Sequence, residues 1–168
     1  AEELRKHPLT FAQLLWPKVT FFNKQIELLH SVRDNDETVV VAGNQLGKDY
    51  CAGFIVVWYF LTHWPCRIVT TSVKDDHLRV LWGEIGWFLN NARKDTILGP
   101  LSLREGGPFK VIHREIRRYV KGYEDPISYV KGMVSEKGEG MAGHHAQYTL
   151  GVIDEACHDS ETEVLTDQ

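Results

Sequence analysis

Apolar residues recur at helical spacing in two stretches of the chain and fill a third stretch almost completely. Steps of three and four residues predict a helical face within the segment 9–33 and an amphipathic helix over 75–91. Between them, the run DYCAGFIVVWYFLTHW (49–64) is long and apolar enough for a largely buried helix that ends before Pro65. The two apolar faces consist of Phe22, Ile26, Leu29 and Val32 in the first helix and of Leu78, Leu81, Trp82, Ile85 and Leu89 in the second.

Three short apolar runs predict strands. TVVVAG (38–43) predicts a buried strand that runs into a glycine turn, and CRIVTTSV (66–73) is rich in the β-branched residues that favour strands. YTLGVIDEA (148–156) predicts a third buried strand, which ends in two adjacent carboxylates. The alternating runs over 99–133, broken by Gly and Pro, indicate a hairpin or small excursion followed by a core strand. Because strands and helices alternate, we expect an α/β domain with a mainly parallel sheet covered by helices.

Length and composition are those of one globular domain spanning residues 1–168. Hydrophobic residues make up 43% of the chain, and a domain of this length buries roughly 70% of its unfolded surface. It needs no disulfides to fold, and its three cysteines, Cys51, Cys66 and Cys157, suit a reducing compartment. The longest uncharged apolar run, 50–61, is too short to span a bilayer, and the N-terminus lacks the apolar core of a signal peptide. We therefore expect a soluble, cytoplasmic protein.

The formal net charge of −4 gives no global basic field of the kind that attracts nucleic acid, although it leaves room for a local basic track. Basic residues interleave with Phe109, Ile112 and Tyr119 in the predicted hairpin, which makes this segment a candidate strip for contacts with the DNA backbone. Acidic neighbours dilute the charge, so a solvated hairpin face is the alternative. The basic residues are Lys110, Arg114, Arg117, Arg118 and Lys121, and the acidic ones are Glu115, Glu124 and Asp125.

The segment AGNQLGKD (42–49) has the character of a phosphate-binding loop. Such a loop needs a strand before it, glycines that turn backbone N–H groups toward the phosphates, a lysine and then a helix. All of these are predicted here, and Lys48 would reach the β- and γ-phosphates. Two residues depart from the usual G-x-x-x-x-G-K-[ST] pattern. Ala42 replaces the first glycine, and Asp49 replaces the hydroxyl residue that binds Mg²⁺.

The substitution at Asp49 has consequences for the metal. A carboxylate can bind Mg²⁺ directly or through water, but it also brings negative charge toward a triphosphate. A loop with no ligand, joining strand to helix, is the alternative for this segment alone.

Two adjacent acids, Asp154 and Glu155, follow the third predicted strand. The carboxyl ends of the strands in an open α/β sheet are where ligands bind. Asp154 would hold the Mg²⁺ shell, mostly through water, and Glu155 would polarise the attacking water for displacement at the γ-phosphate. A solvated turn is the more common setting for two such acids, but their occurrence together with the lysine loop favours ATP hydrolysis.

Upstream of the loop, the stretch Phe21–Gln25 ends in a glutamine whose amide can donate and accept hydrogen bonds at the edge of adenine. A solvated helix glutamine is the alternative interpretation of Gln25.

These residues resemble the ATPase domain of the large terminase subunit, the motor that packages DNA in tailed bacteriophages and related viruses. The resemblance covers most of the chain, from Gln25 through GNQLGKD and TTSVKDDHLRVLWGEI to EGMAGHHAQYTLGVIDEA, and the Gly/His segment 140–146 makes it specific to terminases. It implies an ASCE-type, RecA-like P-loop fold with a three-layer sandwich, and it implies ATP and Mg²⁺ as ligands. The implied nucleotide-binding residues are Gln25, Gly43, Asn44, Gln45, Leu46, Gly47, Lys48 and Asp49, with Asp49 and Asp154 on the metal and Glu155 and Lys48 in catalysis.

The resemblance also implies partners and a missing element. Terminases often carry an arginine finger near the phosphate loop, and the loop here reads Asn44-Gln45-Leu46, so the finger must come from elsewhere. Arg79 is our candidate, with an exposed helix arginine as the alternative. The implied partners are double-stranded DNA, a portal protein, the small terminase subunit and further copies of the chain in a ring of five subunits. The coupling motif and nuclease domain that such proteins carry downstream are not in this sequence.

Other hypotheses remain open. A helicase or translocase motor core shares the lysine loop and the acidic strand, but it requires a second RecA-like domain. A degenerate nucleotide-binding scaffold, in which Asp49 has spoiled Mg²⁺ binding, belongs to a different class of protein. A zinc site built from His144, His145, Cys157 and His158 has poor spacing for tetrahedral coordination, and we set it aside.

Overall fold

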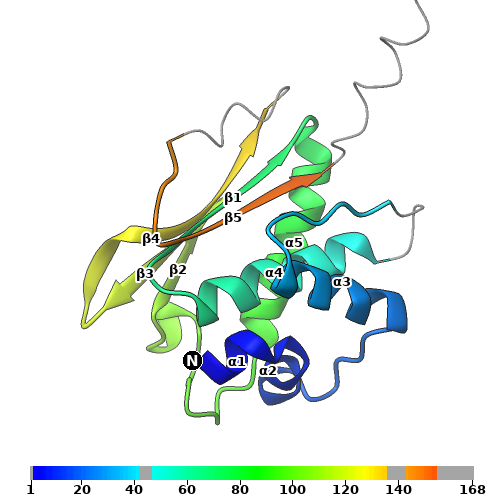
Figure 1. The fold of residues 1–168 in the computed structure, drawn as a ribbon. Helices are drawn as coiled ribbons and strands as arrows, with labels where there is room; N and C mark the ends of the chain where they lie inside the picture. Colours follow the sequence, from blue (N-terminus) through cyan, green and yellow to red (C-terminus); the bar gives the residue numbers. More distant parts are fainter. Residues whose placement is uncertain (1, 42–46, 136–142, 155–168) are drawn as a thin grey trace, which may run out of the picture.

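The computed structural model describes residues 2–41, 47–135 and 143–154 and shows an α/β fold with one five-stranded mixed sheet (Figure 1). The strand order is β2-β3-β4-β1-β5. The strands are β1 (Cys66–Ser72), β2 (Phe109–Ile112), β3 (Glu115–Val120), β4 (Tyr123–Val134) and β5 (Tyr148–Asp154). Strand β1 lies between β4 and β5 and is parallel to both, whereas β2 and β3 add an antiparallel hairpin at one edge. The predictions of a parallel core and of a hairpin within 99–133 are therefore confirmed.

The helices follow the periodicity of the sequence. They are α1 (Glu2–Lys6), α2 (Pro8–Leu15), α3 (Asn23–Asp34), α4 (Lys48–Thr62) and α5 (Asp75–Asn91), with a short 3₁₀ turn, η1, at Leu103–Glu105. The helix predicted over 75–91 matches α5 at both ends. The segment 9–33 forms two helices, because the chain turns at Pro17 and α3 then starts with its own cap, in which the Gln25 side chain accepts a hydrogen bond from the Phe22 N–H (3.0 Å).

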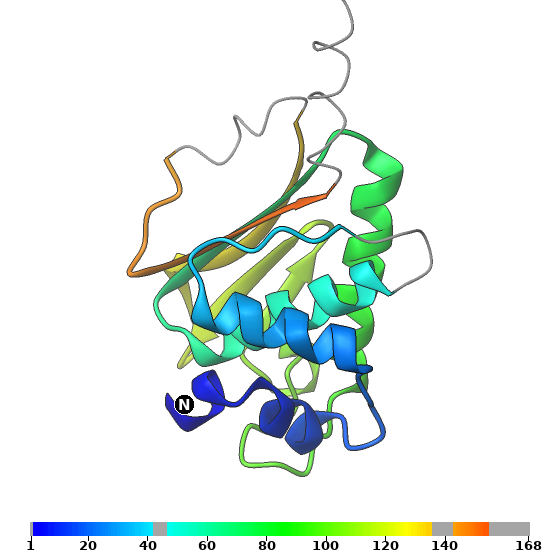
Figure 2. The ribbon, with the colours of Figure 1, turned by 45° about the vertical axis from the view of Figure 1, so that its right-hand side comes forward.

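In the described part of the chain, helices cover one face of the sheet only (Figure 2). Helices α4 and α5 contact β1, and α1, α2 and α3 pack on α4. Residues on the helix-facing side of the sheet, such as Ile68 and Val130, are fully buried, whereas on the other side Thr149 is exposed and Ile153 is 51% exposed. These residues therefore form two layers, where the resemblance to terminases implies three.

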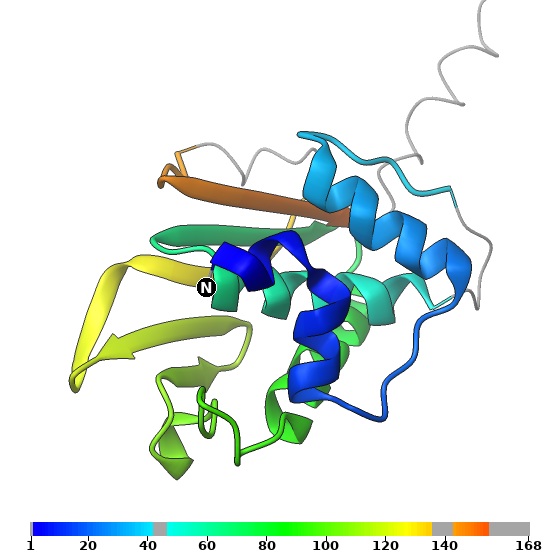
Figure 3. The ribbon, with the colours of Figure 1, turned by 60° about the horizontal axis from the view of Figure 1, so that its bottom comes forward.

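The prediction of a buried strand at the start of the phosphate loop was wrong for the residues that the structure describes. Residues 38–41 belong to no strand, and Val39 and Val41 are 71% and 93% exposed. The segment starts beside α3, where Ser31 and Thr38 hydroxyls lie 2.9 Å apart, and it runs in the same direction as β5 (Figures 1, 2 and 3). The valines are exposed because, among the described residues, no strand pairs with this segment and no layer packs over it. The rest of the loop, 42–46, lies outside the described residues.

The buried core joins α4 to the surrounding helices through aromatic side chains. Phe54 lies at its centre with no exposed surface. Its ring contacts four other aromatic rings, those of Phe11, Trp16, Phe21 and Phe88. At Gly53 the two long helices cross closely, since a Cβ added there would lie 2.7 Å from the Cβ of Glu84 on α5. This crossing packs the N-terminal half of α4 against α5.

A second packed cluster ties the N-terminal helix to the end of α4. Arg5 donates hydrogen bonds to the Thr62 carbonyl and to the Tyr148 hydroxyl (2.9 Å). Beneath it, the His63 imidazole stacks on the Tyr59 ring, with the ring centroids 3.8 Å apart, and only 7% of His63 is exposed. Burial, together with the positive charge of Arg5, lowers the pKa of His63 to about 4. The folded protein therefore holds His63 in its neutral form.

We expect this neutral histidine to make the fold sensitive to acid. The unfolded chain protonates His63 below its ordinary pKa of 6.5, whereas the folded chain does so only near 4, so stability falls as the pH is lowered through this window. The loss should amount to about 1–3 kcal/mol between about pH 7 and pH 4. Urea unfolding of the wild type and of His63→Gln over this range measures the effect. Substitution of the exposed His7 by Gln serves as the control, and equal pH slopes for the wild type and His63→Gln would contradict the prediction.

Candidate functional site

The candidate site lies where the carboxyl ends of β1 and β5 meet the first turn of α4. Asp154 is the last residue of β5, and the strand register places it opposite Ser72 at the end of β1. Lys48, the first residue of α4, reaches this edge of the sheet, and its Nζ lies 2.9 Å from Oδ1 of Asp154. The two residues are 106 positions apart in the chain, so their contact is a property of the fold. The sequence predicted both residues for one site, and the structure brings them together.

His77 is a third member of this cluster that the sequence analysis missed. It is the third residue of α5, and its Nδ1 lies 3.6 Å from Oδ2 of Asp154. Each carboxylate oxygen of Asp154 therefore faces a different basic side chain. The sequence gives only a coarse signal for His77. Its place in the first turn of the helix after β1 puts it near this edge of the sheet, because helices that follow parallel strands start there, but does not pair it with Asp154.

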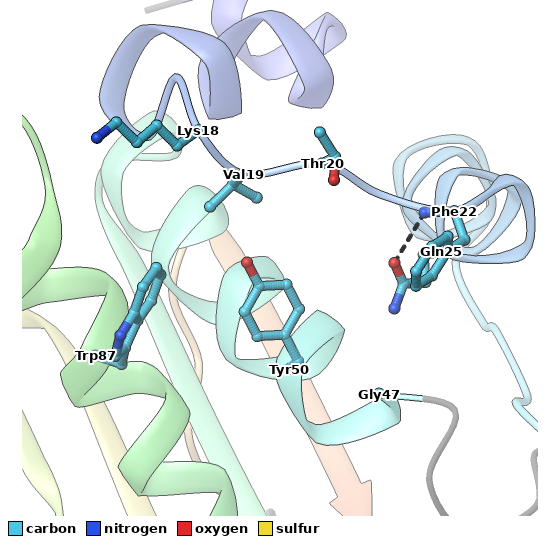
Figure 4. A pocket seen from close by; sticks show the side chains of 8 residues that line it. All are labelled: Lys18, Val19, Thr20, Phe22, Gln25, Gly47, Tyr50 and Trp87. Carbon is cyan, nitrogen blue, oxygen red and sulfur yellow. Dashed lines mark hydrogen bonds between the residues drawn. The ribbon is translucent and has the colours of Figure 1, made fainter.

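The turn that leads into α4 requires a glycine at position 47. Gly47 adopts a left-handed conformation (φ 69°), which glycine adopts without steric cost. A side chain there would also collide with Gln25, whose Nε2 would be 2.9 Å from the added Cβ. Gln25 thus lies directly over the start of α4, and its amide nitrogen is directed toward Gly47 (Figure 4). The contact places two predicted nucleotide-binding residues side by side.

Next to these residues is a pocket of about 430 Å³ (Figure 4). Its walls combine aromatic rings with a few polar groups, and a planar ring system can pack against such walls. The Tyr50 ring lies 6.2 Å from the ring of Trp87 on α5, between centroids, and Phe22 on the other side is 77% exposed. The residues that line the pocket are Lys18, Val19, Thr20, Phe22, Gln25, Gly47, Tyr50 and Trp87.

Asp49, the second residue of α4, lies close enough to α5 for its charge to act on Glu84. Burial raises the pKa of the Glu84 carboxyl, and the negative charge of Asp49 raises it further. Among the described residues, no three His, Cys, Asp or Glu side chains are grouped to hold a metal ion. Mg²⁺, however, needs only one or two protein carboxylates when phosphates and water supply its other ligands. Asp154, whose side chain is 12% exposed and lies beside Lys48, fits that donor set.

Arg79, the candidate finger, lies on the surface of α5. Its guanidinium pairs with Asp76 one turn earlier (2.9 Å), and its side chain is 73% exposed. Within the described part of the chain, no hydrogen bond or ion pair joins this side chain to the Lys48–Asp154 pair. Its role as a finger stays a prediction.

The candidate DNA strip on the hairpin is largely neutralised within the protein. Arg114 pairs with Asp75, and Arg117 pairs with both Glu115 (3.0 Å) and Glu124 (2.8 Å). Arg118 points inward, donates to the Phe60 carbonyl and lies over the Phe60 ring (4.8 Å), and burial lowers its pKa. The geometry therefore favours the solvated, self-paired hairpin face over a basic track.

Several predicted residues lie outside the described part of the chain. These are Gly43, Asn44, Gln45 and Leu46 of the loop, the catalytic candidate Glu155, and Cys157 and His158. Of the remaining members of the zinc hypothesis, His144 contacts the Tyr129 hydroxyl through its Nδ1.

Searches with the sequence and with the structure matched no family model, no curated protein and no solved structure. Within the described ranges, no helix is long and apolar enough to cross a membrane. The class that the fold and site define is therefore an α/β domain with a lysine–aspartate pair at the carboxyl edge of its parallel strands.

Proposed function

We propose that this protein hydrolyses ATP with Mg²⁺ on a P-loop fold of the ASCE, RecA-like type, and uses the cycle to move double-stranded DNA into a viral procapsid. The observation that carries the proposal is the contact between Lys48 and Asp154 (2.9 Å) at the N-terminus of α4. A lysine at a helix N-terminus attracts phosphate, and a carboxylate beside it attracts a divalent cation. Together they match the two charged components of a Mg²⁺–triphosphate complex, the phosphates and the cation.

Each residue has a chemical role in this proposal. The Lys48 ammonium holds the β- and γ-phosphates and balances the charge that develops on them. Asp154 holds the metal shell, and Mg²⁺ supplies charge neutralisation at the phosphates when bound. Glu155, the next residue along the chain, orients and polarises the attacking water. Because Asp49 carries a charge where a hydroxyl is usual, we assign it to the metal shell through water.

The pocket beside Gln25 supports a place for the adenine. Its aromatic residues Tyr50 and Trp87 offer apolar contact for a planar base. The Gln25 amide oxygen already accepts the Phe22 N–H (3.0 Å), which fixes the amide so that its NH₂ group faces Gly47 and the pocket. An amide held in this way offers a donor to an acceptor nitrogen of the base.

The DNA-packaging part of the proposal rests on the resemblance to large terminase subunits. It assigns Arg79 as a finger that completes the site of a neighbouring copy, and an exposed arginine is compatible with a role across a subunit boundary. It also assigns a homo-oligomeric ring, a portal protein, the small terminase subunit and the host cytoplasm as the setting.

A degenerate nucleotide-binding scaffold is the second candidate. The observation that favours it is the acidic character of the site, where Asp49 stands in place of the usual hydroxyl and adds to the effect of burial in raising the pKa of Glu84. Calorimetric titration with ATP, in the presence and absence of Mg²⁺, separates the two. If the protein is an ATP-driven motor, its affinity for ATP must rise with Mg²⁺. Loss of all Mg²⁺-dependent affinity would favour the scaffold.

A substitution at Glu155 tests the chemistry itself. We expect Glu155→Gln to bind ATP as the wild type does and to hydrolyse it at least about a hundredfold more slowly, because the amide cannot accept the proton of the attacking water. Steady-state phosphate release measures the rate, and titration with a fluorescent ATP analogue measures binding. Hydrolysis at the wild-type rate would show that the catalytic carboxylate is assigned to the wrong residue.

A further inference from the structure

We infer that His77 is a positioning residue that holds the Asp154 carboxylate in the orientation in which it receives the metal. The inference rests on the proposed function and adds a residue to the site. The observation behind it is that the two carboxylate oxygens of Asp154 face two different partners, Lys48 at 2.9 Å and His77 at 3.6 Å.

A carboxylate with one partner can rotate about its terminal bond, since that torsion is broad and roughly twofold. A carboxylate with a partner on each oxygen has one preferred orientation. When Lys48 turns to a phosphate, Oδ1 of Asp154 loses its closest described partner, and the contact between Oδ2 and His77 then keeps the carboxylate from rotating as freely as one with no partner. Outer-shell contacts of this kind orient metal-binding carboxylates in proteins.

The element that carries His77 is firmly anchored to the sheet. Leu78 and Leu81 follow His77 in α5, and both are buried against the core. The Trp82 indole N–H donates to the Thr70 hydroxyl of β1 (2.9 Å). A Cβ added at Gly132 on the neighbouring strand β4 would lie 2.3 Å from Nε1 of the same tryptophan, so the indole is closely packed on both strands. The first turn of α5 therefore holds His77 in a defined place relative to Asp154.

A comparison within the protein shows that this contact differs from an ordinary surface pair. His7 and Glu3 on the N-terminal helix are separated by a similar distance, 3.7 Å, but their side chains are 58% and 82% exposed. The corresponding exposures of His77 and Asp154 are 34% and 12%. Exposed pairs are screened by water and contribute little, so burial is what gives the His77 contact its effect.

The test measures how much Mg²⁺ the protein needs in order to bind ATP. In the full-length protein, we expect His77→Phe, which keeps a ring but removes both ring nitrogens, to raise the Mg²⁺ concentration for half-maximal binding of a fluorescent ATP analogue by about tenfold or more. Affinity for the same analogue in EDTA should stay at the wild-type value. His77→Asn, which keeps a side-chain donor, should restore most of the Mg²⁺ dependence. His7→Phe is the matched control and should behave as the wild type.

The outcomes separate this inference from the proposed function. If the wild type binds no ATP at any Mg²⁺ concentration, the proposed function fails and the role of His77 fails with it. If the wild type binds and His77→Phe needs no more Mg²⁺ than the wild type, only the His77 inference is overturned. A loss of affinity in EDTA as large as that in Mg²⁺ also overturns it, because it would indicate general damage to the site. In a second readout that needs no nucleotide, Asp154→Asn should shift the NMR signals of the His77 ring nitrogens, and unchanged signals would contradict the contact.

Discussion

Replacement of Lys48 by alanine is expected to lower the rate of ATP hydrolysis by about a thousandfold, near the upper end of the effect of removing one preorganised electrostatic contact. Lys48 is the cation of the site, at the first turn of α4 and 2.9 Å from Asp154. In phosphoryl transfer the protein acts mainly by positioning and charge stabilisation, so the loss of this ammonium removes a large part of its contribution. Affinity for ATP should fall as well, because ground-state phosphate contacts are lost together with those in the transition state.

The control for this experiment is Lys94→Ala, which removes a lysine that pairs with Glu105 on the protein surface and lies outside the site. It should keep the wild-type rate. Because Lys48→Ala also leaves the largely buried Asp154 without its closest partner, thermal unfolding should accompany the kinetics. A folded Lys48→Ala protein that hydrolyses ATP within tenfold of the wild-type rate would contradict the assignment of Lys48.

Replacement of Phe54 by alanine is expected to lower the free energy of unfolding by about 3–5 kcal/mol, the usual cost of truncating a fully buried aromatic side chain. The ring has no exposed surface and contacts four other aromatic rings. Its removal leaves a cavity between α2, α4 and α5 that rigid neighbours fill only in part. A loss of this size is a large fraction of the roughly 5–15 kcal/mol that stabilises a typical domain.

Urea denaturation at neutral pH measures the change, and Phe22→Ala provides a matched substitution at a site that is 77% exposed. The control should change stability by no more than about 0.5 kcal/mol. A loss below about 1 kcal/mol for Phe54→Ala would mean that the aromatic cluster is not the centre of the core.

The sequence predicted well those elements whose burial follows from the pattern of neighbouring residues. Alternation of apolar and polar residues over 75–91 placed α5 at both ends, because one side of that helix is buried and the other exposed along its whole length. The valines at 39–41 also predict burial, but burial of a strand depends on which strands lie beside it, and local pattern carries no information about them. The same limit applies to Arg118, whose place in a basic run gives no sign that it lies over the Phe60 ring while its neighbour Arg117 pairs with carboxylates.

For the candidate site, the sequence identified the residues with the most specific surroundings. Lys48 follows a glycine-containing turn, and Asp154 ends an apolar strand, so both could be placed at one edge of a parallel sheet. His77 could not be paired with Asp154 in this way. The angle at which α5 packs on the sheet decides whether its first turn reaches that carboxylate, and that angle is set by contacts such as Trp82 with Thr70.

The contact between Lys48 and Asp154 also determines which ligands can enter the site at low cost. An anion that draws Lys48 away separates the Asp154 carboxylate from its nearest positive charge, and a cation that draws Asp154 away does the same to Lys48. Either ligand alone must offset the attraction that it breaks. A ligand that carries a phosphate and a divalent cation together replaces both charges at once. Under the proposed function, the resting ion pair would thus discriminate between a metal–nucleotide complex and its separate components.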